Sequence, residues 1–158
     1  MSSAIDVEAV LKSTELFRSF TDTGIQILAS IADVKDVPAG TPLFVQNMIG
    51  DGLYVVAEGR VRLTVRGPDG RDVTLAILAA PSTMGEAAIL RSGPRLCSAV
   101  AEVPSVVIEL SRRDIANLQR TKPQAVLKLM MAVVELVGDR VRNLDEDLRQ
   151  FVAWKAGL

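Results

Sequence analysis

The sequence contains no histidine, and this absence removes several kinds of chemistry at once. Many metalloenzymes hold their ion with several imidazoles, and most hydrolytic triads use an imidazole as the general base. Carboxylates, lysine or a thiolate can still catalyse reactions, so the absence of histidine lowers the expectation of catalysis without excluding it. We therefore expect no catalytic residue, no metal site and no cofactor.

Cysteine is nearly absent as well, because Cys97 is the only one in 158 residues. A single cysteine cannot form a disulfide within the chain or a thiolate metal cluster. The longest uncharged apolar stretches, such as residues 75–80, are far too short to span a bilayer. We recognise no signal peptide, and these features together predict a cytoplasmic protein with no membrane partner.

The chain also lacks an excess of charge of either sign. Eighteen basic residues stand against nineteen acidic ones, which gives a net charge of −1. A nucleic-acid surface usually shows a clustered basic excess, so we expect no DNA binding through bulk charge. Aromatic residues make up 4% and hydrophobic residues 49%, which predicts a mostly aliphatic core.

The apolar pattern divides residues 1–158 into three parts of what we expect to be one domain. Residues 1–32 show helical spacing, residues 33–111 show strands, and residues 112–156 show helical spacing again. The clearest strand feature is a β-hairpin, in which residues 60–66 and 73–77 alternate polar and apolar side chains around the turn Gly67-Pro68-Asp69-Gly70. The sequence therefore predicts a mainly β domain, an antiparallel roll of strands with flanking helices.

Several residues are good helix starts. Asp6 can cap the first helix, and either Thr21 or Asp22 can cap the second. Ser111 with Asp114 nearly matches a capping box. Pro123 fits the first turn of the last helix, where its missing amide donor costs nothing.

The last helix, residues 124–154, would be about 46 Å long, whereas a small domain is ~30 Å across. It must therefore project toward a partner or break, and we expect a break to occur at Gly138. A nearly heptad series of apolar residues along it favours pairing of two such helices in a homodimer. The alternative is that the first half packs on its own domain and only the tail is free. The series consists of Met130, Val133, Val137, Val141, Leu144, Leu148 and Phe151.

The residues that carry a functional argument lie in the segment 84–99. Gly85 permits unusual backbone angles and close approach, and residues 86–90 can form one helical turn whose amides point at an anion. Arg95 can offer a fixed fork of donors to phosphate oxygens. Glu86 would be repelled by a phosphate, so we expect it to accept a hydrogen bond from a sugar hydroxyl and to balance Arg95 in the empty site. An ordinary surface ion pair between Glu86 and Arg95 is the alternative, and it leaves the glycines unexplained.

This segment strongly resembles the phosphate-binding cassette of the cyclic-nucleotide-binding domain family, which includes bacterial catabolite activator proteins and regulatory subunits of cAMP-dependent protein kinase. Residues 53–61 look like the strand–Gly–strand signature of the same family, and residues 16–20 and the terminal helices also fit. The resemblance implies an antiparallel jelly-roll β-barrel with short N-terminal helices and a long C-terminal helix. The cassette pattern is met by Gly85, Glu86, Ala88, Ile89, Leu90, Pro94 and Arg95.

The resemblance also implies roles for individual residues. Glu86 would bind the ribose 2′-hydroxyl and Arg95 the cyclic phosphate. Backbone amides of the turn, at Gly85, Ala87 and Ala88, would support the phosphate.

Two residues of the cassette depart from the usual pattern. Leu96 is larger than the small residues that usually follow the arginine. Cys97 stands where Ala, Ser or Thr is common, and a threonine there is associated with cGMP, so its absence favours cAMP. A small packed residue is a better interpretation of Cys97 than a redox thiol. On the last helix, Arg140 and Asn143 are the candidates for contact with the base.

In the catabolite activator branch the long helix forms the dimer interface and a helix-turn-helix DNA-binding domain follows it. This sequence ends at Leu158, directly after the helix, so the resemblance predicts a stand-alone sensor that acts on an unidentified downstream protein. Two alternatives stay open. One is an interaction module with an empty pocket, and the other is a metal-free jelly-roll enzyme that uses Glu86 as a base. Intact Glu86 and Arg95 argue against the first, and the missing histidines argue against the second.

Overall fold

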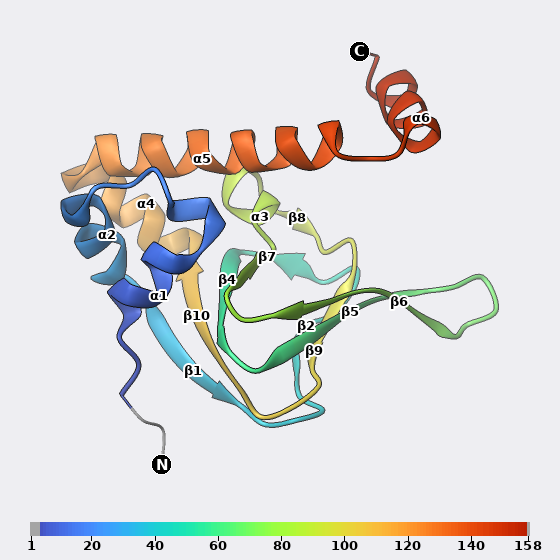
Figure 1. Ribbon diagram of the computed structural model, residues 1–158, viewed down its shortest axis with the longest axis horizontal. Helices are drawn as coiled ribbons and strands as arrows, with labels where there is room; N and C mark the ends of the chain where they lie inside the picture. Colours follow the sequence, from blue (N-terminus) through green and yellow to red (C-terminus); the bar gives the residue numbers. More distant parts are fainter. Residues whose placement is uncertain (1–3, 158) are drawn as a thin grey trace.

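The computed structural model describes residues 4–157, in which two four-stranded antiparallel sheets are flanked by helices (Figure 1). The first sheet has the order β1–β10–β4–β7, with β1 Asp33–Val37, β10 Ser105–Ser111, β4 Gly52–Glu58 and β7 Ser82–Met84. The second has the order β2–β9–β5–β6, with β2 Pro42–Phe44, β9 Ser98–Ala101, β5 Arg60–Arg66 and β6 Asp72–Ala79. A short ribbon pairs β3 Ile49–Gly50 with β8 Gly93–Pro94.

Strand β4 contributes side chains to two separate hydrophobic cores. Tyr54 and Val56 belong to a cluster that joins the two sheets, while Leu53 and Val55 belong to a cluster that joins β4 to the helices. Successive side chains of a strand point to opposite faces, so a strand that is buried on both faces is apolar throughout. The predicted antiparallel roll is confirmed, although the described strands form two sheets and a ribbon rather than one closed barrel.

The predicted hairpin is present as β5 and β6, but its apolar residues do not all face inward. The register shifts between Leu63 and Thr64, and this shift leaves Leu75 of β6 without a Cα partner. A β-bulge of this kind changes which side chains point to each face. As a result Leu78 is partly buried, while Leu75 and Ile77 are exposed.

The N-terminal helices are short and begin at the expected caps. They are α1 Val7–Ser13, the 3₁₀ turn η1 Glu15–Phe17 and α2 Asp22–Ala29. The carboxylate of Asp6 accepts from the Ala9 amide at 3.1 Å, and the Thr21 hydroxyl oxygen accepts from the Gly24 amide at 3.1 Å. Of the two candidates for the second cap, Thr21 is therefore the residue used. These helices bury Leu11, Phe17, Ile25 and Leu28 against β4, β10 and α5.

The C-terminal part contains α4 Arg112–Thr121, α5 Pro123–Arg142 and α6 Glu146–Ala156. Ser111 caps α4, and Pro123 is in the first turn of α5, both as predicted. The long helix does break, but the expected break at Gly138 was wrong, because Gly138 lies inside α5. A glycine costs a helix only about 1 kcal/mol. The break follows Arg142, where Asp145 caps a new helix by accepting from the Leu148 amide at 3.0 Å.

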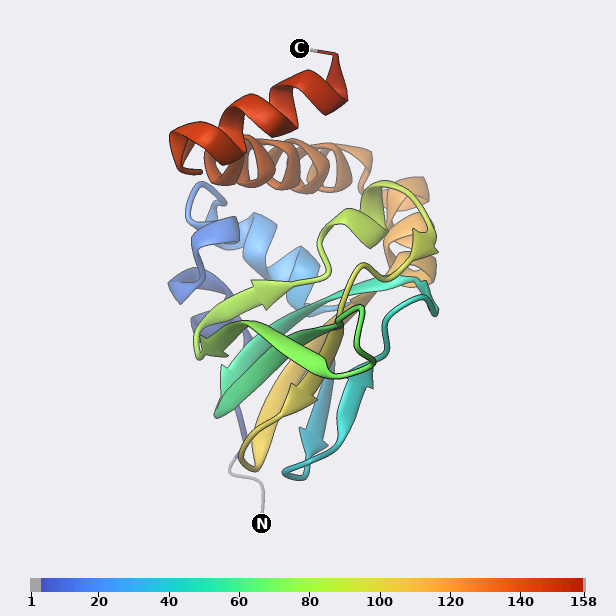
Figure 2. The same ribbon diagram turned by 90° about the vertical axis from the view of Figure 1, so that its right-hand side faces the viewer.

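Helix α5 lies across the end of the sheets (Figures 1 and 2), and this packing divides the predicted apolar series. Val133 is fully buried in the domain core and Met130 packs against that core, so this half of the series follows the alternative interpretation. Leu144 lies in the break, and the side chain of Phe151 lies outside the described part. The exposed stripe of α5 consists of Leu127, Met131, Val134 and Val137, of which only Val137 belongs to the predicted series. No described helix has the length and apolarity needed to cross a membrane.

Candidate functional site

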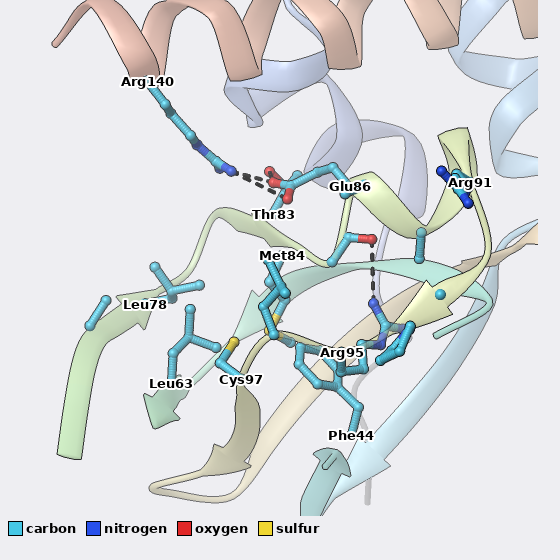
Figure 3. Close-up of a pocket in the computed structure, with 17 residues that line it drawn as sticks. Phe44, Leu63, Leu78, Thr83, Met84, Glu86, Arg91, Arg95, Cys97 and Arg140 are labelled. Carbon is cyan, nitrogen blue, oxygen red and sulfur yellow. Dashed lines mark hydrogen bonds and ion pairs between the residues drawn. The ribbon is translucent and has the colours of Figure 1, made fainter. Parts of the chain in front are cut away.

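A cavity of about 500 Å³ opens between the second sheet, the segment 84–97 and α5 (Figure 3). Its sheet side is apolar, with Leu63, Ala76 and Leu78, and its other side carries charged groups from the segment and from α5. Eight of the nine residues predicted to bind a ligand line this cavity. They are Gly85, Glu86, Ala87, Ala88, Arg95, Leu96, Cys97 and Arg140.

The segment reverses direction at Gly85, whose φ of +74° lies in the left-handed region that favours glycine. The short helix α3, Ala87–Leu90, follows directly and gives the predicted helical turn. Its geometry differs from the expectation in one respect. The Ala88 amide donates to the Gly85 carbonyl at 3.2 Å, so it is used within the turn and is not free for an anion.

Glu86 is buried, with 5% of its surface exposed, and its carboxylate has two partners. Oε1 accepts from the Thr83 hydroxyl at 2.6 Å and from Arg140 Nη2 at 2.9 Å, while Oε2 accepts from Arg140 Nη1 at 3.3 Å. The expectation that Arg95 balances Glu86 was wrong. Arg140 on α5 takes that place (Figure 3), because α5 crosses above the turn and brings a guanidinium to the carboxylate.

Arg95 is also buried, with 8% of its surface exposed, and it is held by backbone oxygens and an aromatic ring. Nη2 donates to the Gly52 carbonyl at 2.9 Å, and Nη1 donates to the Gly85 carbonyl over 3.4 Å. The guanidinium carbon lies 4.2 Å from the centre of the Phe44 ring. The Nε atom is buried without a hydrogen-bond partner. Arg95 thus offers a concentrated positive charge beside the cavity, with donors that the protein does not fully use.

The two residues after Arg95 differ in their surroundings. Leu96 is 86% exposed at the cavity edge, whereas Cys97 is partly buried beside it. Burial raises the pKa of the Cys97 thiol, and the positive charge of Arg95 lowers it by less. The thiol is therefore mostly protonated at neutral pH and is a poor nucleophile. This favours a packing role for Cys97 over a redox role.

The remaining sequence-predicted residue, Asn143, does not line the cavity. It is exposed at the end of α5, where the helix unwinds, so its contact with a base stays a prediction without structural support. Sequence reasoning missed two residues that shape the site. Thr83 lies three residues before Glu86, a spacing that on a turn brings a hydroxyl to a carboxylate. Phe44 is distant in sequence from Arg95, so no local pattern points to it.

The described residues hold no group of three or more cysteine, aspartate or glutamate side chains arranged to bind a metal ion. The cavity places the charged groups of Glu86 and Arg95 opposite an apolar wall. It suits a ligand with one anionic group, one hydroxyl group and a flat apolar part.

Comparison with known proteins agrees with this chemistry. Residues 34–122 match the family model described as the cyclic nucleotide-binding domain. The Cyclic AMP receptor protein of Thermus thermophilus is 32% identical over 138 residues, which cover 87% of this chain and 62% of that protein.

Solved structures show the same fold. The crystal structure of the Thermus thermophilus Catabolite Activator Protein has a TM-score of 0.75 and 30% identity, covering 87% of this chain and 63% of that one. The N-terminal domain of a transcriptional regulator from Streptomyces coelicolor A3(2) also gives a TM-score of 0.75, with 27% identity, and covers 87% of this chain and 98% of that one. The chain thus spans less than two thirds of the length of the Thermus thermophilus relative, both by sequence and by structure.

Proposed function

The chain belongs to the cyclic nucleotide-binding domain family, and from this we propose that it is a sensor domain that binds a cyclic nucleotide and catalyses no reaction. One observation carries the proposal. The cavity brings together a buried carboxylate, Glu86, and a buried guanidinium, Arg95, and the two are not paired with each other. Such a separation leaves the guanidinium for an anion, while the carboxylate, held by Thr83 and Arg140, can accept from a hydroxyl group through Oε2.

In this proposal the cyclic phosphate lies against Arg95 and the Gly85 turn. The 3.4 Å contact from Arg95 Nη1 to the Gly85 carbonyl is long for a hydrogen bond, so a phosphate oxygen can replace it at little cost. The ribose 2′-hydroxyl donates to Glu86. The base lies along the apolar wall of Leu63 and Leu78, where a flat ring removes apolar surface from water.

We propose cAMP as the preferred ligand over cGMP. The supporting features are the cysteine in place of a threonine at position 97 and the likeness to a relative that is named for cyclic AMP. The net charge of −1 supports a domain that does not itself contact DNA, and the single cysteine supports a cytoplasmic location.

The signal would pass through Arg140. The 2′-hydroxyl needs an acceptor, and Glu86 Oε2 is available if it gives up the weaker, 3.3 Å contact with Arg140 Nη1. Arg140 would then hold Glu86 through Nη2 alone, and the end of α5 would change its position. A ligand can shift this equilibrium only by binding the two arrangements with different affinity. The break at 143–145 replaces Gly138 as the hinge in this mechanism.

A homodimer through the C-terminal helix is also proposed, on a face of α5 that shares only Val137 with the series that the sequence indicated. The exposed stripe of α5 consists of four apolar residues spaced by four, three and three, which suits pairing with a second helix. A dimer would join two copies of the sensor through the helix that Arg140 connects to the cavity. The downstream protein that reads this change is unidentified.

Calorimetric titration with cAMP, cGMP and a cyclic dinucleotide tests the ligand. We expect cAMP to bind and to raise the Tm, because a ligand of the folded state stabilises it by mass action.

Arg95→Ala should weaken cAMP binding by about 2 kcal/mol or more. Arg91→Ala is the matched control, since Arg91 borders the same cavity but is exposed. Neither heat nor a Tm shift with any of the three ligands at millimolar concentration would refute the proposed function and leave the interaction module as the better interpretation.

A further inference from the structure

We propose that Phe44 and Gly50 are positioning residues for Arg95. They set the plane of its guanidinium and how far it reaches into the cavity, and thereby how strongly it binds an anionic group. The inference rests on the proposed function for the identity of that group. Neither residue belongs to the segment 84–97, and neither can contribute a charge or a hydrogen-bonding side chain.

The backbone brings Phe44 and Gly50 to Arg95. The Asn47 amide donates to the Arg95 carbonyl at 2.8 Å, and the Arg95 amide donates to the Met48 carbonyl at 2.7 Å. Just beyond these contacts, Gly50 pairs with Gly93 in the ribbon of β3 and β8. Residues 44–50 therefore run along the segment that carries Arg95, and the alignment is fixed by backbone hydrogen bonds.

The ring of Phe44 compensates the charge of Arg95. A guanidinium buried to this extent normally pairs with a carboxylate, because an unpaired buried charge is strongly disfavoured. Among the residues that the structure describes, no carboxylate lies within ion-pair distance of Arg95. The face of an aromatic ring attracts a cation, and this attraction grows when both are removed from water. The ring centre of Phe44 at 4.2 Å is well within that range, and Tyr54 supports the ring at a centroid distance of 5.9 Å.

Gly50 leaves room for the Arg95 guanidinium on the side of its Nε and Cζ atoms. A Cβ atom added at Gly50 would collide with Nε and Cζ of Arg95. The φ angle of Gly50 lies outside the left-handed region, so its backbone conformation does not itself require a glycine. The close approach of Arg95 is therefore what requires a residue without a side chain at position 50. Gly85 also leaves room for the guanidinium, at Nη1, but its positive φ already calls for glycine.

This enclosure leaves a donor unused. Nε is buried without a partner, although Nη1 and Nη2 both contact backbone carbonyls. A phosphate oxygen is the acceptor that suits a donor of this kind. The ring and the glycine hold the guanidinium plane, so they determine which of its hydrogens an anion can reach.

Two ligands that differ by the phosphate separate positioning from general structural damage. We expect Phe44→Leu to weaken binding of cAMP about tenfold, the loss expected when a desolvated cation–π contact is removed. Gly50→Ala should weaken it by a similar factor, because the added methyl group displaces the guanidinium of Arg95. Binding of adenosine, measured by displacement, should change by less than about twofold, since adenosine has no phosphate for Arg95 to hold. Phe20→Leu is the matched control, because Lys128 lies 5.3 Å from the Phe20 ring in an analogous pair remote from the cavity. An equal loss for both ligands, or no loss for cAMP, would overturn the inference.

A second measurement decides the inference in the free protein. We expect Gly50→Ala to lower the Tm, and we expect most of that loss to disappear in the Arg95→Ala background, where the colliding guanidinium is absent. The same loss in both backgrounds would overturn the inference. If the unaltered protein bound no cyclic nucleotide, the proposed function would fail, but this cycle would still test whether Gly50 accommodates Arg95.

Discussion

Arg140 and Glu86, 54 residues apart in the sequence, meet through two contacts of 2.9 and 3.3 Å. The carboxylate is buried in the cassette turn, while the arginine belongs to the last full turn of α5 and its side chain is half exposed. The pair therefore connects the predicted ribose-binding group to the end of the helix. Because coupling between two sites is reciprocal, a change at Glu86 and a change in α5 must influence each other equally.

Arg140→Gln should uncouple α5 from the cavity. In the unaltered protein we expect cAMP to change hydrogen–deuterium exchange in residues 141–156, because the ligand alters the contact that holds the end of α5. The variant lacks the bidentate contact, so exchange there should be faster without ligand and nearly insensitive to cAMP. The free energy of unfolding should fall by about 1 kcal/mol, since the Thr83 hydroxyl still donates to Glu86.

Arg142→Gln is the control for this experiment. Arg142 lies on the same helix and pairs with Asp139 at 3.2 Å on the exposed side, away from Glu86. Its loss should leave the effect of cAMP on exchange unchanged. If Arg140→Gln retained the full ligand effect, the signal would not pass through this pair.

Thr83→Val should reduce the ability of the site to recognise the ribose hydroxyl. The Thr83 hydroxyl fixes Glu86 Oε1 at 2.6 Å, so its removal leaves the carboxylate held by Arg140 alone. The ratio of the affinities for cAMP and 2′-deoxy-cAMP should fall about fivefold, equivalent to the loss of one hydrogen bond. Thr74→Val is the matched control, because Thr74 accepts from Arg62 at 2.9 Å on the exposed hairpin. An unchanged ratio in Thr83→Val would show that Thr83 has no part in reading the hydroxyl.

The sequence predicted those features of the fold that depend on local chemistry. Caps at Asp6 and Ser111 and the turn of the hairpin follow from side chains acting on their own neighbours. The break in the last helix was misplaced because a glycine only weakens a helix, whereas Asp145 starts a new one. The sequence did not show which side chains of β6 are exposed, because the alternation of apolar residues does not reveal a β-bulge.

In the site, too, the sequence predicted the features that depend on neighbouring residues. The residues of the cassette are consecutive, and therefore one segment of sequence identified most of the cavity. The partner of Glu86 was missed because Arg140 reaches it through the tertiary packing of α5 on the cassette. For the same reason nothing in the sequence linked Phe44 to Arg95. Local spacing identifies which groups are present, but the contacts between distant segments decide which groups pair.

Met131→Lys should weaken self-association without affecting ligand binding. The exposed stripe of α5 contains Leu127, Met131, Val134 and Val137, and an apolar stripe of this kind is stabilised when a second helix covers it. A lysine at Met131 would place two charges near the centre of such an interface. We expect sedimentation analysis to show a dimer for the unaltered protein and a monomer for the variant at the same concentration. Gln124→Lys, which adds the same charge at an exposed polar position of α5, should stay dimeric. A monomer for the unaltered protein at all concentrations would refute the proposed dimer, and a dimer that survives Met131→Lys would place the interface on another face.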